Sequence, residues 1–206
     1  MWQSDAGFNK VALEHYEQAI ALYREVEDKD GTAWAIGNSG MAHSNMMNND
    51  EALDHYKQAL ALYEEIDDKE GRATMVNNIG KMQANSGERE EGLKHLEQAL
   101  ELRREIEDDH GTATTLNNIG GVYAEMGDKR QALTYFEQAL ELLEQGNDRT
   151  SLITTLTNIA ASYKGIGESR KAAYFEKRAK KLGKEMRAEI KKAKKARREL
   201  RRQMGS

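Results

Sequence analysis

The chain has 206 residues, of which 38% are hydrophobic and 32% charged, and its formal net charge is −4. It contains no cysteine, which excludes disulfides, thiol chemistry and cysteine-based metal sites. No apolar run approaches the roughly 18 residues of a membrane span, and the first residues lack a signal-peptide pattern. The composition therefore predicts a soluble, cytoplasmic protein.

A 40-residue repeat organises the whole sequence. Residues 111–142 read GTATTLNNIGGVYAEMGDKRQALTYFEQALEL, and residues 31–62, 71–102 and 151–182 are imperfect copies of this stretch. Self-similarity at such a period is typical of stacked-repeat proteins, in which each unit buries its apolar face against its neighbours. We therefore expect one elongated all-helical domain.

Residues 1–28 match only the second half of this repeat. A helix is predicted from Gly7 to about Asp28, with apolar residues at three- and four-residue spacings. Its first-helix partner is missing, so we expect Trp2 and Phe8, or a second chain in a homodimer, to cover the open face.

Four full units follow, at about 29–68, 69–108, 109–148 and 149–182. Their helix pairs are predicted at 30–47 and 50–67, 70–86 and 89–107, 110–126 and 129–145, and 149–166 and 169 onward. An aspartate recurs before the first helix of each unit, where a short carboxylate caps unpaired N–H groups; the four are Asp28, Asp68, Asp108 and Asp148.

Glycines mark the turn inside three of the units. Gly87, Gly127 and Gly167 stand where the first helix must end, a position that favours a left-handed residue. The first unit has Met47 there, so one of the adjacent asparagines, Asn48 or Asn49, is expected to be left-handed instead.

Small residues recur inside each hairpin, where two helix backbones must approach closely. We expect large residues to interlock around them, as in ridge-and-groove packing. The small residues are Gly40, Gly80, Gly120 and Ala160 on the first helices and Ala59, Ala99, Ala139 and Ala179 on the second helices.

Together these residues make the sequence resemble the tetratricopeptide repeat. The best-fitting unit carries the pattern as Leu116, Ile119, Gly120, Tyr123, Gly127, Ala132, Phe136 and Ala139. The second unit departs from it at Gln83, Gly92 and Leu96, the fourth at Ala160 and Glu176, and the usual proline is absent. The 40-residue spacing is similar to that of kinesin light chains, Leu-Gly-Asn-type adaptors and bacterial sensor regions. The resemblance implies an α-α superhelix that serves as a protein–protein interaction scaffold.

The resemblance also implies a binding face lined by the first helices. The same asparagine recurs in every unit, at Asn38, Asn78, Asn118 and Asn158. An amide can donate to and accept from the backbone of an extended peptide, so we expect this asparagine ladder to bind a peptide or protein segment. The alternative is that each asparagine bonds to the neighbouring repeat. Specificity is expected from nearby positions: Trp34, Met41, Asn77, Lys81, Asn117 and Lys164.

No catalytic, cofactor or metal constellation is found in the sequence. His15, His55 and His95 recur every 40 residues, but Tyr135 and Phe175 continue the series, which favours packing of a flat ring. Helices 8–10 Å apart are also too distant to share one metal ion through these rings. His43 and His110 are interpreted as isolated. We therefore expect no enzyme activity.

The C-terminal extension, 183–206, differs chemically from the body. Residues 177–206 hold 14 Lys or Arg against three acidic residues, so the net charge of −4 divides into +11 there and −15 elsewhere. One helix is predicted from Ser169 to Gln203, with a thin apolar stripe: Leu182, Met186, Ile190, Ala193, Leu200 and Met204.

Three interpretations of this helix remain open. The first is a cap on the fourth unit that also contacts an acidic partner, which we favour. The second is a basic binder of nucleic acid or anionic membrane, although aromatic stacking residues are lacking. The third is a coiled-coil linker toward an output domain, or a helix that docks on the acidic body of another copy. A separate possibility for the whole protein is an effector-sensing module of a larger regulator.

Overall fold

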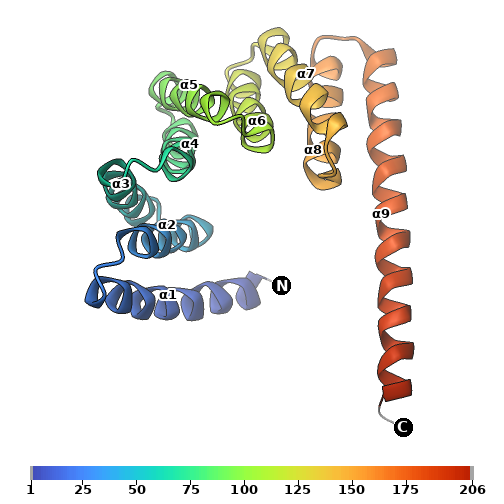
Figure 1. Cartoon of the computed structure of the whole chain (residues 1–206). Helices are drawn as coiled ribbons and strands as arrows, with labels where there is room; N and C mark the ends of the chain where they lie inside the picture. Colours follow the sequence, from blue (N-terminus) through green and yellow to red (C-terminus); the bar gives the residue numbers. More distant parts are fainter. Residues whose placement is uncertain (1, 205–206) are drawn as a thin grey trace. The chain divides into compact units, whose positions relative to one another are not determined.

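The structure is a computed structural model that describes residues 2–204, with side chains described for 7–197 and for 199. Every element in this range is a helix, nine in total, which confirms the all-α hairpin repeat (Figure 1). The helices are α1 (Trp2–Glu25), α2 (Lys29–Asn45), α3 (Asn49–Glu65), α4 (Lys69–Ser86), α5 (Arg89–Glu105), α6 (Asp109–Glu125), α7 (Lys129–Gln145), α8 (Arg149–Gly165) and α9 (Ser169–Met204).

The chain forms two compact units, which we describe separately. Unit 1 is Met1–Ile119 and unit 2 is Gly120–Ser206, so α6 runs from one into the other. In unit 1 each helix from α1 to α4 packs on the next one along the chain, and in unit 2 α8 packs on both α7 and α9. Each helix pair buries its apolar stripe against its neighbour, as expected for a repeat stack.

Aspartate side chains cap the helices as predicted. Asp28 accepts a hydrogen bond from the backbone N–H of Gly31 at 2.9 Å, and Asp108 accepts from that of Gly111 at 2.8 Å. Asp68 and Asp148 cap α4 and α8 in the same way. These bonds satisfy helix-terminal donors that have no partner within the helix.

Left-handed residues end several helices, and one assignment from the sequence was wrong. Gly87, Gly127 and Gly167 have φ of 101°, 91° and 82°, as predicted. In the first unit, however, Met47 itself is left-handed with φ of 62°, whereas Asn48 has φ of −85°. The N–H of Asn48 bonds to the carbonyl of His43 at 3.0 Å, which closes the turn around Met47. The Met47 side chain points to solvent, so only the backbone strain of a left-handed side-chain residue opposes this turn.

Close approach of the two helices of a hairpin explains the recurring glycines. A Cβ on Gly40 would lie 2.9 Å from the ring of Tyr56, and one on Gly120 would lie 2.6 Å from the ring of Phe136. At Gly80 the obstacle is the backbone carbonyl of Gly92, at 2.7 Å. The small residues are therefore required by the hairpin contact itself.

Stacked rings fasten the same hairpins near their surface. His43 stacks on His55 with ring centroids 5.0 Å apart, and Tyr123 stacks on Tyr135 at 5.4 Å. The third pair is Tyr163 with Phe175, at 5.7 Å. The recurring ring position is therefore used for packing, as expected. His43, which the sequence analysis treated as isolated, is the stacking partner in the first hairpin.

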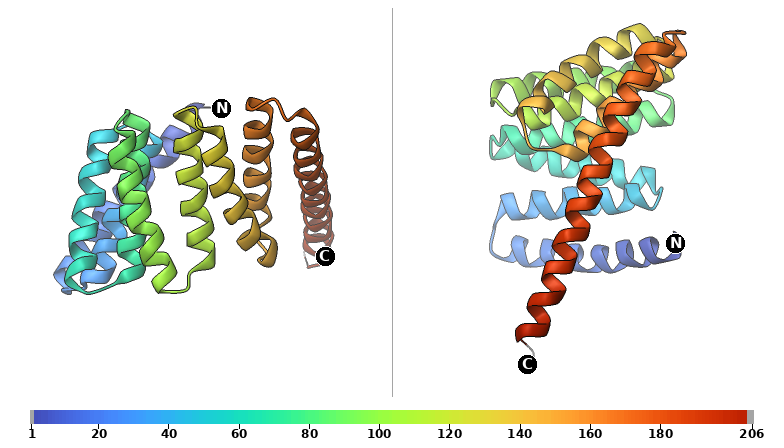
Figure 2. Two further views of the ribbon diagram at one scale, coloured as in Figure 1. Left: turned by 90° about the horizontal axis from the view of Figure 1, so that it is seen from above. Right: turned by 90° about the vertical axis from the view of Figure 1, so that its right-hand side faces the viewer.

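The long helix α9 has two different halves. Its first half packs on α8 through Ala172, Phe175, Ala179 and Gly183, and Arg149 of α8 forms an ion pair with Glu189 at 2.7 Å. From residue 187 onward every described side chain is exposed, and α9 runs past the end of α8 (Figures 1 and 2). The first turns therefore cover α8 as predicted, whereas Ile190 and Ala193 of the predicted stripe meet solvent. The side chains of Leu200 and Met204 lie outside the described residues.

Helix α1 leaves an apolar surface exposed. It begins at Trp2 instead of Gly7, because an exposed glycine weakens a helix by only about 1 kcal/mol and does not stop it. Phe8 is 75% exposed and Val26 71% exposed, and Val11 and Leu22 are also exposed. The predicted cover by Phe8 is therefore not formed, and the side chain of Trp2 lies outside the described residues.

Candidate functional site

A hollow of about 470 Å³ lies between the first helices α2 and α4 of unit 1. Both helices run along the same side of unit 1, with α3 and α5 on the other side (Figure 1). The hollow contains four of the residues predicted from the sequence, namely Trp34, Asn38, Met41 and Asn78. Its other lining residues are Asp30, Gly37, Tyr63, Asp68, Glu70, Gly71, Thr74 and Met75.

A second, smaller hollow of about 190 Å³ continues the first one. Met41 and Asn78 line both hollows, so the two form one groove, which we call the α2/α4 groove. The predicted residue Lys81 lines the second hollow, together with Ser44, Asn45, Tyr56, Met82 and Asn85. Five of the ten predicted site residues therefore share this groove.

Large apolar side chains in the groove are open to solvent. Trp34 is 51% exposed and Met41 47% exposed, although both belong to a helix whose other apolar residues are buried. The ring of Trp34 also meets the edge of Tyr16 of α1, with centroids 6.1 Å apart. This contact fixes the indole beside the groove and leaves part of its surface available.

The recurring asparagines have different environments. Asn38 is half-buried and donates from Nδ2 to the carbonyl of Trp34 at 2.8 Å, one turn earlier in its own helix. Asn78 accepts at Oδ1 from Nδ2 of Asn77 at 3.3 Å. Within the described residues no hydrogen bond uses Oδ1 of Asn38 or Nδ2 of Asn78, so each amide keeps one group available in the groove.

Asn77 and Asn118 join neighbouring first helices. Asn77 is buried, and its Oδ1 accepts from Nδ2 of Asn118 at 2.9 Å and from the hydroxyl of Thr115 at 3.3 Å. These bonds link α4 to the part of α6 that belongs to unit 1. The amide nitrogen of Asn118 therefore makes the contact with a neighbouring repeat that the sequence analysis kept as an alternative.

The remaining predicted residues do not line the groove. Asn117 is half-buried on α6 of unit 1. Asn158, half-buried, and Lys164, exposed near the end of the helix, both belong to α8 in unit 2.

Three carboxylates give the first hollow a negative charge. Burial, together with the smaller effect of the charges of Asp30, Asp68 and Glu70, raises the pKa of Tyr63 to about 12. None of the 12 lining residues of this hollow is a lysine or arginine.

None of these carboxylates was predicted as a site residue: Asp68 was interpreted as a helix cap, and Asp30 and Glu70 were given no role. Their spacing carried the signal: Glu70, Thr74 and Asn78 lie on one helix face at four-residue intervals, as do Asp30, Trp34 and Asn38.

Two other types of site do not occur among the described residues. Within them, no helix is long and apolar enough to cross a membrane, and no cluster of three or more His, Cys, Asp or Glu is arranged to hold a metal ion.

The comparison with known families agrees with the repeat architecture. The tetratricopeptide repeat family matches residues 4–65 and 71–145, about two thirds of the chain. The chain belongs to the tetratricopeptide repeat family. No curated protein sequence matches it.

Solved structures share the fold at low sequence identity. BtubC (BKLC) from P. vanneervenii is 24% identical, with a TM-score of 0.72 over 84% of this chain and 75% of that one. A Rap protein in complex with Competence and Sporulation Factor is 22% identical, with a TM-score of 0.79 over 90% and 52%. Aspartyl phosphate phosphatase F from Bacillus subtilis is 16% identical, with a TM-score of 0.79 over 88% and 50%. This chain therefore spans about half the length of the last two. As a tetratricopeptide repeat, it is a protein-interaction scaffold.

Proposed function

We propose that this repeat protein binds an extended peptide or protein segment in the α2/α4 groove. The observation that carries the proposal is the hollow itself, in which Trp34, Asn38, Met41 and Asn78 lie together. A Rap protein with the same fold has been crystallised with Competence and Sporulation Factor, so the fold is compatible with a bound factor.

The two amides and the apolar pair would have separate roles in this binding. Asn38 and Asn78 offer an acceptor and a donor, which suit the N–H and C=O groups of a peptide backbone of any sequence. Trp34 and Met41 offer exposed apolar surface for one side chain of the ligand, and an aromatic anchor commonly carries much of the binding energy at an interface. Asn118, which belongs to the same unit, would extend this ladder of amides to ligands longer than the groove.

The test uses the pair Asn38→Ala and Asn78→Ala in the intact protein. Asn118 is left unchanged, because its bond to Asn77 makes a loss of binding ambiguous. The control pair is Asn49→Ala and Asn147→Ala, two exposed asparagines outside the groove. Pull-down of interacting proteins should fail with the groove pair and persist with the control pair. Equal capture by both variants would refute the groove as the binding site.

The exposed half of α9 supports a second contact surface. Residues 187–202 contain nine Lys or Arg and two acidic residues, and the described side chains among them are all exposed. Such a helix attracts an acidic partner, and it lacks the aromatic residues that stack on nucleic-acid bases. A protein without residues 190–206 should lose capture of acidic partners and keep those captured through the groove. Loss of nucleic acid or anionic vesicles alone would contradict the choice of an acidic protein.

A further inference from the structure

The α2/α4 groove carries opposite charges at its two ends. Asp30, Asp68 and Glu70 line the first hollow, without a lysine or arginine, and Lys81 lines the second without a carboxylate. Asp30 and Glu70 belong to the first turns of α2 and α4, whereas Lys81 follows Glu70 by 11 positions on α4. The neutral residues Asn78 and Met41 connect the two ends.

In the part of the chain that the structure describes, no ion pair joins a carboxylate of the first hollow to a lysine or arginine, although Lys69 borders Asp68 and Glu70 in an adjoining hollow. Within the described residues, the lysines and arginines close to them in sequence pair with carboxylates that do not line this hollow. These pairs are Lys29 with Glu65, Lys69 with Glu105, and Arg72 with Asp67. Arg103 donates to the hydroxyl of Thr74, which lines the hollow, and pairs with Asp108.

The environment of Tyr63 reports the same negative charge. Tyr63 is buried in the wall of the hollow, and after burial the next causes of its raised pKa are the charges of Asp30, Asp68 and Glu70. A phenolate would be disfavoured there, whereas a ligand cation would be favoured by the same field. The face of Trp34, in the same hollow, is a further favourable surface for an ammonium or guanidinium group.

We propose that the groove selects an extended peptide with a lysine or arginine at the carboxylate end and an aspartate or glutamate beside Lys81. The proposal rests on the peptide-binding function above and specifies its ligand. The 11 positions from Glu70 to Lys81 correspond to about 16 Å along a helix. An extended chain covers that length in about five residues, so the two charged residues of the ligand are about five positions apart.

Charge also decides between a separate partner and a second copy of this chain. The exposed half of α9 carries the positive charge that the carboxylates would attract. However, it is helical and has few carboxylates that could form an ion pair with Lys81. A segment with both charges satisfies both ends of the groove. We therefore assign the groove to a separate partner and treat the basic helix as a competitor to be tested.

The experiment is selection of a random octapeptide library on the immobilised intact protein. The enriched peptides should carry a basic and an acidic residue about five positions apart. Their affinity, measured by fluorescence anisotropy, should fall about fivefold in the variant Asp30→Asn with Glu70→Gln, as expected for a partly exposed charge pair, and this loss should shrink at high salt.

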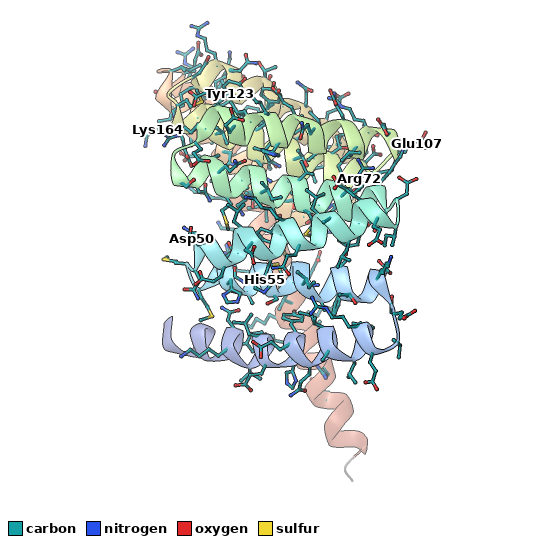
Figure 3. All side chains as sticks on the ribbon, turned by 90° about the vertical axis from the view of Figure 1, so that its left-hand side faces the viewer. Asp50, His55, Arg72, Glu107, Tyr123 and Lys164 are labelled. Carbon is teal, nitrogen blue, oxygen red and sulfur yellow. The ribbon has the colours of Figure 1, made fainter. Side chains whose placement is uncertain are left out.

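Matched controls separate the groove from the overall charge. Asp50→Asn with Glu90→Gln removes two carboxylates from the first turns of α3 and α5, outside the groove. Figure 3 shows that the control residue Asp50 lies at the end of the helices of unit 1 opposite to Arg72, which follows the tested residue Glu70 by two positions on α4. For the other end of the groove, Lys81→Met should weaken the same peptides, whereas Lys57→Met, a change at an exposed lysine of α3, should not.

Each contrary result has one meaning. Enriched peptides without a charge pattern that are still lost in the Asn38→Ala, Asn78→Ala protein would overturn this inference and leave the proposed function standing. Equal affinity of the selected peptides for the Asp30→Asn, Glu70→Gln protein and for its control would also overturn the inference and leave the proposed function standing. No enrichment at all would overturn both proposals. Stronger binding by a synthetic peptide of residues 187–202 than by any selected peptide would assign the groove to a second copy instead.

Discussion

Two adjacent glycines of α6 occupy opposite environments. A Cβ on Gly120 would lie 2.6 Å from the ring of Phe136, whereas a Cβ on Gly121 would meet nothing within 4 Å. We therefore expect Gly120→Leu to destabilise the protein by about 1–3 kcal/mol through overpacking. Gly121→Ala should stabilise it by up to about 1 kcal/mol, because alanine favours the helix. Urea unfolding followed by circular dichroism measures both changes. Equal stability of the two variants would contradict the hairpin contact.

Tyr63 couples the stability of the protein to alkaline pH. Its pKa of about 12 in the folded protein exceeds the ordinary value of 10, so between these two pH values the folded state holds a proton that the unfolded state has lost. The stabilisation should be fully present below pH 10 and should be lost between about pH 10 and 12, a change of up to about 3 kcal/mol.

The comparison with Tyr63→Phe isolates this effect. The phenylalanine variant keeps the ring in place but has no group that titrates, so its free energy of unfolding should fall less steeply over the same pH range. Asp30→Asn with Glu70→Gln should lower the pKa of Tyr63, measured as phenolate absorbance. A pH dependence shared by the wild type and Tyr63→Phe would show that Tyr63 titrates normally.

The role of an individual residue could be predicted from the sequence where a single local requirement determines it. The aspartate caps satisfy unpaired N–H groups at helix starts, and the glycines adopt the left-handed backbone of the turns. Both features can be predicted from the residue type at a single position. The left-handed conformation of Met47 could not be predicted from its residue type. Backbone hydrogen bonds to Ser44 and His43 fix this turn, and they hold the methionine in a strained conformation. The hydrogen bond between Asn77 and Asn118 could not be predicted either. It joins two neighbouring repeats, and the pattern of one repeat does not show which residues of the next repeat lie beside it.

Among the elements, α9 combines a packed half with a solvated half. Its contacts with α8 end near Met186 and Glu189, and the described residues from 190 onward are exposed. We expect removal of residues 190–206 to change the free energy of unfolding by less than about 0.5 kcal/mol, since the described side chains in this range are all exposed. Urea unfolding tests this expectation, and a larger loss would show that the end of α9 packs on the body.

A single substitution checks the packed half of the same helix. Gly183 is buried beside α8, but a Cβ there would only reach ordinary contact, 3.9 Å from Ile153. Gly183→Ala should therefore stabilise the protein by up to about 1 kcal/mol, measured by thermal unfolding. A loss of stability would mean that α8 and α9 are packed too tightly for a methyl group.

The positions of the helices could be predicted because the helix caps and turn residues recur in each of the four repeats. The predicted ends agree with the structure to within about two residues for α2 to α8, where caps and turns recur. Helix α1 lacks an upstream cap, and its start was misplaced by five residues, from Gly7 to Trp2. The exposure of Ile190 was also hidden from the sequence, because an apolar stripe does not show where the neighbouring helix ends.

For the whole molecule, the segregation of charge should govern non-specific adsorption. Removing residues 190–206 deletes eight basic and one acidic side chain, which changes the net charge from −4 to −11. We expect the intact protein to bind a cation-exchange resin at pH 7 and low salt despite its negative net charge, because a local basic patch suffices for adsorption. The truncated protein should flow through, and equal retention of both would place the adsorbing charge elsewhere.

The fold class was predictable from the sequence, but the charged character of the groove was not. Forty-residue periodicity and small residues at hairpin contacts specify repeat hairpins without any knowledge of neighbours. The carboxylates of Asp30 and Glu70 line one hollow only because α2 and α4 lie side by side, and that arrangement depends on the stacking of whole repeats.

The bare apolar strip on α1 makes the scaffold open to extension by protein engineering. Phe8, Val11 and Leu22 of α1, and Val26 directly after it, are exposed apolar side chains. A synthetic helix with the sequence of Lys29–Asn45, fused ahead of Trp2, would cover that strip as a new module. Further modules added in register would lengthen the array one step at a time, giving a modular receptor whose reach is chosen by the engineer.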